Sequence, residues 1–336
     1  MSSGRIETKS GQPGVVVALV NYCTRDLTVD CLRSLETLVG EFPGMRVVVA
    51  DNASPDGSGA QIAKAIEDYG WGDWAKLLPL PRNGGFSYGN NAVVRECLGV
   101  TEPPDYIWLL NTDTIVRPGA LRALIEFMEQ QPDAGMAGSR LEHPDGARQC
   151  SAFRFHTVAS EFEASLGLGI VSKALKHWAV APPLTDVPSR YEWISGASML
   201  IRTQVFRDIG LMDEEYFLYY EETDFCLRAE NRGWTCWYVP ASRVIHLVGK
   251  STGVTDAAGR IKRRAPYWFQ SRRRYFLKHH GVVYAVLADA ALATGTGLSM
   301  LLDAVRGRPA SHPQKFLHDL AQQSALLNRS LSEHRA

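Results

Sequence analysis

Short apolar runs alternate with amphipathic patterns from the start of the chain to residue 130. Each apolar run predicts a strand, and the segment after it carries apolar residues at helical spacing. The predicted strands are 15–20, 47–50, 76–80 and 106–110, and the predicted helices are 27–39, 59–69, 88–98 and 118–130, the last with Pro118 in its first turn. This regular alternation predicts an α/β fold with a doubly wound, mostly parallel sheet.

Polar residues follow three of the predicted strands. Open α/β sheets bind ligands outside the carboxyl ends of their strands. Three polar endings at one edge therefore outline a binding crevice. The endings are Asn21-Tyr22, Asp51-Asn52 and Asn111-Thr112-Asp113.

The strand–helix rhythm breaks after residue 134. The later pattern predicts β segments at 135–137, 192–201 and 235–239 and helices at 203–209 and 221–231, whereas 153–187 gives no clear pattern. We find no repeat or low-complexity linker, so the break is interpreted as an insertion within one domain, residues 1–258. A basic and amphipathic helical region, 259–336, follows.

The charge balance and the cysteine content of the chain argue against some classes of function. The 336 residues hold 36 Lys and Arg against 36 Asp and Glu. This balance argues against nucleic-acid binding, which needs a basic excess. Six scattered cysteines without metal-ligand spacing are typical of reduced thiols in a cytoplasmic protein. The N-terminal residues show no secretion signal.

The late part of the chain has two features of its own. Residues 262–278 are strongly basic, which predicts either a solvated face or contacts with phosphate groups. Residues 281–305 are apolar, but Asp289 and Asp303 make them a poor membrane span. The pattern instead predicts an amphipathic helix that packs on the body, pairs with a second subunit in a homodimer, or lies at the inner face of the membrane.

Three carboxylates, Glu221, Glu222 and Asp224, lie at the start of a predicted helix. The helix dipole favours acidic residues there, which is a purely structural explanation. The preceding residues are rich in Tyr and Phe, however, and would shield the carboxylates from water. Partial desolvation raises a carboxylate pKa toward the range of a general base.

Two glycine-containing segments have features of phosphate-binding loops. The Gly/Asn-rich segment 82–91 lacks the G-x-G-x-x-G pattern, so hydride chemistry is disfavoured, and the segment is either a turn or a close approach to an anionic ligand. The run from Gly249 to Thr252 ends like a P-loop, but that motif needs a Gly where the chain has Val244. A P-loop is therefore rejected.

An ordered set of motifs between residues 14 and 255 resembles the bacterial family-2 glycosyltransferases, which have a GT-A-type fold, and most of all their rhamnosyltransferases. The motifs are VALVNY, VVVADNASPDGS, RNGGFSYGNN, WLLNTDT, the long segment from WISGASML to EETDFCLR, and VIHLVGKSTG.

The resemblance implies a role for each matching position. Asp51, with Asn21 and Tyr22, would hold the base and ribose of a nucleotide-sugar donor, and Asp113 would bind Mg²⁺ or Mn²⁺. Asn111 departs from the family's Asp-x-Asp motif and removes one charge. Further donor contacts would come from Asn83, Gly84, Asn91, Asn111 and Thr112.

The resemblance also implies an inverting transfer to a hydroxyl of a saccharide or lipid-linked acceptor. Glu222 would be the catalytic base, Asp224 would support it, and His246 is open between a metal ligand and a structural residue. The best-matching donor is dTDP-rhamnose. A UDP-hexose donor, a sugar nucleotidyltransferase and a non-catalytic binding module remain as alternatives.

Overall fold

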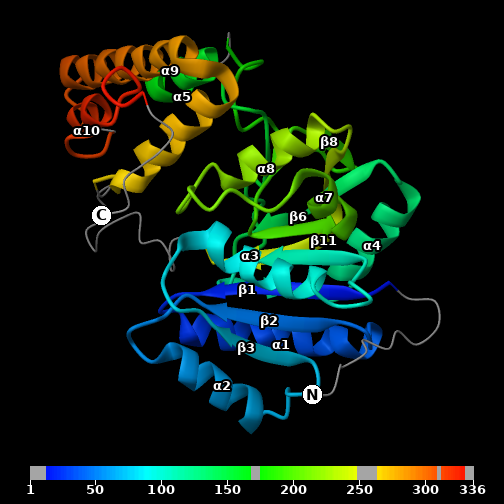
Figure 1. The fold of residues 1–336 in the computed structure, drawn as a ribbon. Helices are drawn as coiled ribbons and strands as arrows, with labels where there is room; N and C mark the ends of the chain where they lie inside the picture. The colour runs from blue at the N-terminus through cyan, green and yellow to red at the C-terminus, as the bar shows by residue number, and fades with distance from the viewer. Residues whose placement is uncertain (1–12, 168–174, 248–262, 309–311, 330–336) are drawn as a thin grey trace. The chain divides into compact units, whose positions relative to one another are not determined.

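The computed structural model describes residues 13–167, 175–247, 263–308 and 312–329 (Figure 1). These residues form two compact units. The first unit is built from 13–152, 184–214 and 222–247. The second is built from 153–167, 175–183, 215–221, 263–308 and 312–329. The predicted boundary between residues 258 and 259 lies outside the described residues.

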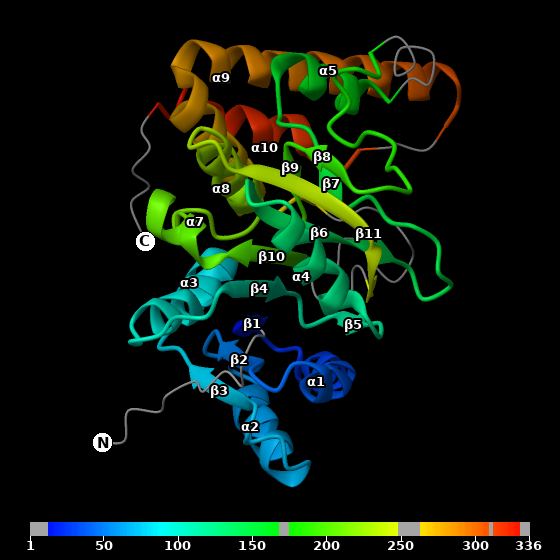
Figure 2. The ribbon, with the colours of Figure 1, turned by 90° about the vertical axis from the view of Figure 1, so that its right-hand side faces the viewer.

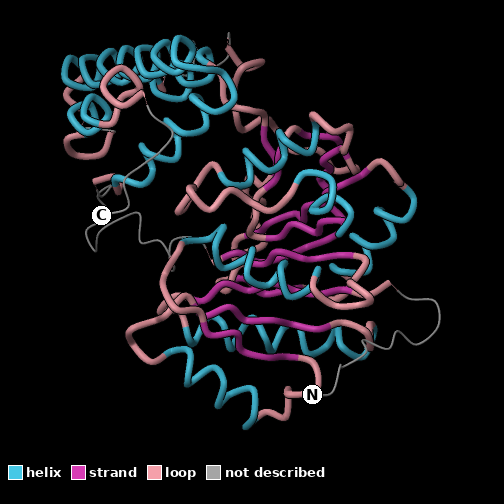
Figure 3. The backbone as a smooth tube through the Cα atoms, viewed as in Figure 1, coloured by secondary structure: helices cyan, strands magenta, loops and turns pink. Residues whose placement is uncertain are grey.

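The first unit is organised around a sheet of nine strands within the described residues, in the order β3-β2-β1-β4-β10-β6-β11-β5, with β8 beside β11. Figure 3 shows these strands in magenta with helices around them. Strands β3, β2, β1 and β4 are parallel to one another, whereas β10 runs antiparallel to both β4 and β6. The strands are β1 (Val15–Asn21), β2 (Arg46–Asp51), β3 (Ala75–Pro79), β4 (Tyr106–Leu110), β5 (Thr114–Val116), β6 (Ala134–Glu142), β8 (Ser189–Tyr191), β10 (Ser198–Arg202) and β11 (Thr235–His246). Two short strands, β7 (Ala152–Phe153) and β9 (Trp193–Ile194), lie outside this sheet.

Helices cover both faces of the sheet (Figure 2). Helices α1 (Arg25–Glu41), α2 (Ser58–Asp68) and α4 (Ala120–Gln130) pack on one face, and α3 (Gly85–Leu98) and α7 (Thr203–Ile209) lie on the other. Helix α8 (Glu221–Glu230) precedes β11. This arrangement confirms the predicted α/β architecture.

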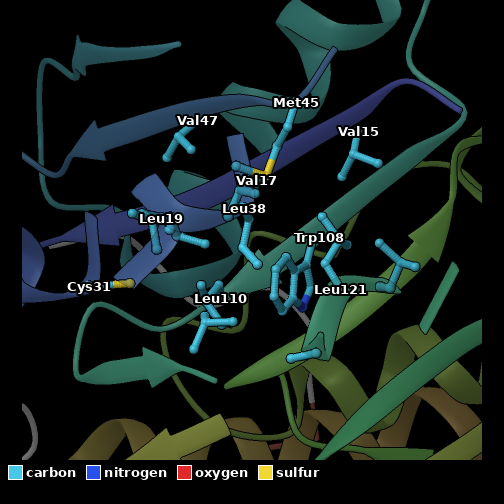
Figure 4. Close-up of a cluster of buried hydrophobic side chains, with 14 of the residues drawn as sticks. Val15, Val17, Leu19, Cys31, Leu38, Met45, Val47, Trp108, Leu110 and Leu121 are labelled. Carbon is cyan, nitrogen blue, oxygen red and sulfur yellow. The ribbon is translucent and has the colours of Figure 1, made fainter. Parts of the chain in front are cut away.

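The main core lies between the sheet and α1, α2 and α4 (Figure 4). Alternate residues of β1 point into it, among them Val17 and Leu19, because side chains of a strand alternate between its two faces. They meet Leu38 of α1 and Leu121 of α4, and Trp108 of β4 is fully buried among them. Strands buried on both faces explain the continuous apolar runs in the sequence.

Several predicted bounds are corrected by the structure. Pro118 lies in the turn before α4, not in its first turn, and Gly119 with φ +78° precedes the helix. Strand β6 is longer than the predicted 135–137, and β11 runs on to His246 because a bulge between Val239 and Arg243 accommodates Pro240 without ending the strand.

The second unit is helical. It contains α5 (Val158–Leu166), α9 (Pro266–Val305) and α10 (Phe316–Gln322). Helix α5 falls in the segment whose pattern was unclear. Helix α9 is long and apolar enough, by length and composition, to cross a membrane, and 39% of its most apolar stretch is buried. Gly281, with φ +79°, divides it into two helical segments.

Candidate active site

The carboxyl ends of β1 and β2 are joined by a buried hydrogen-bond network centred on Asn21. Asn21 and Asp51 are direct partners in the strand pairing, and the Asn21 amide nitrogen lies 2.7 Å from Asp51 Oδ1. The same nitrogen contacts Ser54 and Ser58, and the Asn21 oxygen accepts from Thr24 and Thr28. Asn21 therefore uses its polar atoms to hold the strand ends and helix starts in place.

A pocket of about 430 Å³ opens beside this network. Thr24 and Ser58, both bonded to Asn21, line it together with Arg25 and Asp56. Tyr22 is 44% exposed, so its ring is accessible to a ligand. The pocket borders Asn21 through Thr24 and Ser58, but its lining does not include Asn21, Tyr22 or Asp51, so the base and ribose site stays a prediction. A larger pocket, of about 600 Å³, is lined by other residues, such as Val48 and Trp74, and likewise includes none of the predicted site residues.

The start of α3 follows the glycine-rich segment. Asn83 accepts a hydrogen bond from the Gly85 N–H at 3.1 Å, and Gly85 has φ +84°, which favours glycine. A Cβ on Gly84 would lie 2.4 Å from the Tyr88 ring, so the backbone approaches that ring closely. Asn91 is fully buried and bonds both the N–H and the C=O of Met212. Asn91 therefore anchors a distant loop to α3.

The end of β4 leads directly into β5, and β5 pairs with the end of β11. In this pairing His246 lies opposite Thr114, one residue after Asp113. The His246 Nε2 atom lies 3.4 Å from Asp113 Oδ1, and the Asp113 carbonyl accepts from the Leu247 N–H. Asn111 donates its backbone N–H to Ala197. The two residues predicted as metal ligands, 133 positions apart, thus lie side by side.

Asp113 and His246 offer a carboxylate oxygen and an imidazole nitrogen. Mg²⁺ binds through one or two carboxylates together with substrate phosphates and water, and Mn²⁺ accepts the same oxygen ligands. Within the described ranges, no group of three or more His, Cys, Asp or Glu side chains is arranged around a metal site. The residues present fit a divalent cation that completes its shell with a diphosphate. They do not fit a cation held by the protein alone.

Glu222 occupies the start of α8, and its carboxylate points at the turn before β10. The Gly196 N–H donates to Glu222 Oε1 at 3.1 Å. Burial raises the pKa of Glu222, and hydrogen bonds from its own backbone and from Gly196 only partly offset this. Among the described residues no cation forms an ion pair with Glu222. The carboxylate has the properties of a general base.

Gly196 is confined between Glu222 and an aromatic ring. A Cβ at this position would lie 3.0 Å from the Phe86 ring and 3.1 Å from Glu222 Cγ. The sequence analysis did not identify Gly196 or Phe86 as site residues. The signal was a single glycine in the small-residue run before a buried strand, and its partners are too distant in sequence to be read from the pattern.

The backbone before α8 is strained. Tyr219 and Tyr220 both adopt left-handed conformations, with φ of 72° and 67°. Such conformations cost on the order of 1–3 kcal/mol each for bulky residues and persist at functional sites. They directly precede the helical turn that carries Glu222.

Asp224 differs from its neighbour Glu222. It is fully buried, and Arg228 donates to it at 2.8 Å. Arg228 also bonds the carbonyls of Ile209 and Leu211. This geometry ties α8 to the end of α7, so the supporting catalytic role of Asp224 stays a prediction. The run from Gly249 to Thr252 lies outside the described residues.

The mostly parallel sheet, the Asp113–His246 pair and the half-buried Glu222 carboxylate are the features expected of a glycosyltransferase of the GT-A architecture. A family model described as glycosyltransferase like family 2 matches residues 9–274. The chain belongs to this family.

Relatives and solved structures agree with the assignment. The chain is 28% identical over 264 residues to the N-acetylglucosaminyl-diphospho-decaprenol L-rhamnosyltransferase of Mycobacterium tuberculosis, covering 75% of this chain and 77% of the relative. It is 30% identical over 165 residues to the rhamnosyltransferase WbbL of Escherichia coli, covering 48% of this chain and 60% of the relative. The fold is similar to a mannosyltransferase of Pyrobaculum calidifontis solved with GDP-Man and Mn²⁺, with TM-score 0.54, 12% identity and coverage of 95% and 81%.

Proposed function

We propose that the protein transfers L-rhamnose from dTDP-rhamnose to a hydroxyl of a lipid-linked saccharide, with inversion, in cell-surface polysaccharide synthesis. The observation that carries the proposal is the half-buried carboxylate of Glu222, which accepts a hydrogen bond from the Gly196 N–H and whose pKa is raised by desolvation. The names of the relatives in Mycobacterium tuberculosis and Escherichia coli support rhamnose as the sugar, and the first of them supports a polyprenyl diphosphate carrier.

Asn21 orients the donor side of the site. The Asn21 amide donates a hydrogen bond to Asp51 Oδ1, which fixes the orientation of the Asp51 carboxylate at the end of β2. Asp51, Tyr22 and the adjoining pocket would bind the hydroxyls of the donor ribose and the carbonyls of the donor base. Asn83 and Gly84 would set the backbone near the donor phosphates at the start of α3.

Asp113 and His246 would hold a divalent cation, Mg²⁺ or Mn²⁺, which supplies positive charge to stabilise the diphosphate leaving group. Glu222 takes the proton of the acceptor hydroxyl as its oxygen attacks the anomeric carbon. The bond from that carbon to the diphosphate oxygen breaks in the same step. A single displacement inverts the centre and needs no covalent enzyme intermediate.

The test measures nucleoside diphosphate release by the purified protein from dTDP-rhamnose and from UDP-hexoses, with a short-chain saccharide-diphospholipid as acceptor. We expect turnover with dTDP-rhamnose that a chelator abolishes and that Mn²⁺ or Mg²⁺ restores. Nuclear magnetic resonance of the product should show the anomeric configuration inverted.

Two variants separate chemistry from folding. Glu222→Gln should lower turnover by about 10²- to 10⁴-fold. Glu230→Gln removes a carboxylate from the far end of the same helix and should leave turnover unchanged. Turnover with a UDP-hexose but not with dTDP-rhamnose would show that the donor is the UDP-hexose. Pyrophosphate release from a nucleoside triphosphate and a sugar phosphate would instead identify a nucleotidyltransferase.

A further inference from the structure

The second segment of α9, after Gly281, has two faces of opposite character. One face is buried against the rest of the second unit. Gly295 lies so close to α5 that a Cβ there would be 2.0 Å from Ser165 Oγ. Asp289 on the same face accepts hydrogen bonds from Arg272 and from the Ala325 N–H. This face is therefore fixed in the protein.

The other face is apolar and exposed, and we call it the apolar stripe. Its large residues are Val283, Leu287, Leu298, Leu301 and Val305, which are 77%, 52%, 41%, 60% and 77% exposed. Their spacing of three, four and eleven residues places them on one side of an α-helix. Leucine and valine gathered on one side of a helix form a contiguous apolar surface, which marks an interaction site.

The charged residues around the apolar stripe indicate what kind of surface it binds. Between Gly281 and Val305 the only charged residues are Asp289, which is paired with Arg272, and Asp303. Basic residues stand at both ends. Arg306 and Arg308 follow the stripe and are exposed. Arg274 and Lys278 precede it, half-buried, and each lies over the Tyr216 ring. An apolar stripe between basic ends complements a membrane surface that carries anionic lipids.

The C-terminal basic end has a pocket of about 430 Å³. Arg306, Arg308 and His312 line it, together with Ser165 and Ser299. The acidic residue in the lining is Asp303. Because this pocket adjoins the end of the stripe, it places positive charge where lipid headgroups would meet a helix whose apolar side enters the acyl region.

We propose that the apolar stripe of α9 lies in the interface of an anionic membrane, parallel to its surface. Crossing the bilayer is excluded by the opposite face, because α5, with Glu161 and Glu163, would have to enter the hydrocarbon with it. The proposal does not depend on the donor or on the reaction, although a lipid-linked acceptor would be met at the same surface.

Flotation of the full chain with vesicles tests the proposal. Wild type should float with vesicles of phosphatidylcholine and phosphatidylglycerol, and more weakly with phosphatidylcholine alone. Leu287→Glu/Leu301→Glu should lower binding about tenfold or more, because two carboxylates would enter the apolar interface. Arg306→Ala/Arg308→Ala should lower binding to the anionic vesicles by on the order of tenfold and leave binding to phosphatidylcholine unchanged.

The matched control is Val100→Glu/Val187→Glu, which adds the same charge at two exposed apolar residues of the first unit. It should bind vesicles like wild type. Circular dichroism should show the same helicity for all variants. Wild type that fails to float, or Leu287→Glu/Leu301→Glu that floats equally well, overturns the proposal. A wild-type dimer that this variant converts to monomer, without vesicle binding by either, would make the stripe an interface between two copies instead.

Discussion

Two glutamates, one from each unit, have opposite surroundings: Glu161 is buried and Glu222 is half-buried. Glu161 of the second unit pairs with the buried guanidinium of Arg272 and with His156, and although burial opposes ionisation, these charges hold the pKa of Glu161 below its usual range. Glu222 of the first unit has a backbone N–H as its partner, and burial raises its pKa. The ion pairs of Glu161 stabilise the fold. Glu222 has a raised pKa, which suits the proposed role as the base that accepts the acceptor proton.

The largest expected effect is the response of Glu222→Gln. Beside the rate loss proposed above, we expect its thermal midpoint to equal or exceed that of wild type, because the substitution removes a half-buried carboxylate whose ionisation is opposed by desolvation. Differential scanning calorimetry measures the midpoint. If Glu222→Gln lost activity because it unfolds, Glu222 would be a structural residue like Glu161, and the proposed difference between the two glutamates would be wrong.

The next effect is on the stability of the second unit. Glu161→Gln leaves part of the Arg272 charge uncompensated in a buried position, since among the described residues Asp289 is the one carboxylate that remains paired with it. Breaking a buried pair in this way costs about 3–5 kcal/mol. Urea unfolding should show the loss, while the donor affinity of the remaining folded protein should not change. Equal stability of variant and wild type would mean that the cluster is not a structural one.

Asp224→Asn should give a smaller loss of stability, about 1–3 kcal/mol, because the partner Arg228 is 20% exposed and remains partly solvated, whereas Arg272 is only 1% exposed. Turnover should fall far less than in Glu222→Gln, two residues away. Steady-state kinetics at a temperature below both unfolding transitions checks this. A loss of turnover equal to that of Glu222→Gln would instead give Asp224 a catalytic role.

The contributions of Glu161 and Glu222 to the free energy of unfolding should change with pH in opposite directions. The folded-state pKa of Glu161 is depressed, so its stabilisation is present above the unfolded value of 4.5 and is lost as pH falls through the folded pKa. The folded-state pKa of Glu222 is raised, so its contribution is present below 4.5 and is lost as pH rises through the folded pKa. The acid limb of turnover should therefore lie above pH 4.5 and disappear in Glu222→Gln.

The sequence predicted the parallel half of the sheet well, because its strands are buried on both faces and stand out as apolar runs between helices. It placed Asp113 and His246 in a common site only through resemblance, since their proximity depends on the β5–β11 pairing. The partners of Asn21 and Asn91 could not be predicted, because one short side chain selects among many distant groups. The course of β11 past Pro240 was missed because a bulge overrides the local signal.

The proposed cation site forms only when β5 and β11 pair in the observed antiparallel register. Side chains alternate along β11, so a shift of one residue would turn His246 to the opposite face of the sheet and away from Asp113. Insertions elsewhere between β6 and β11 would leave this pairing intact, whereas a single residue gained or lost between Arg243 and His246 would abolish it. Loss of cation binding would then report a misthreaded strand even where the protein remains folded and soluble.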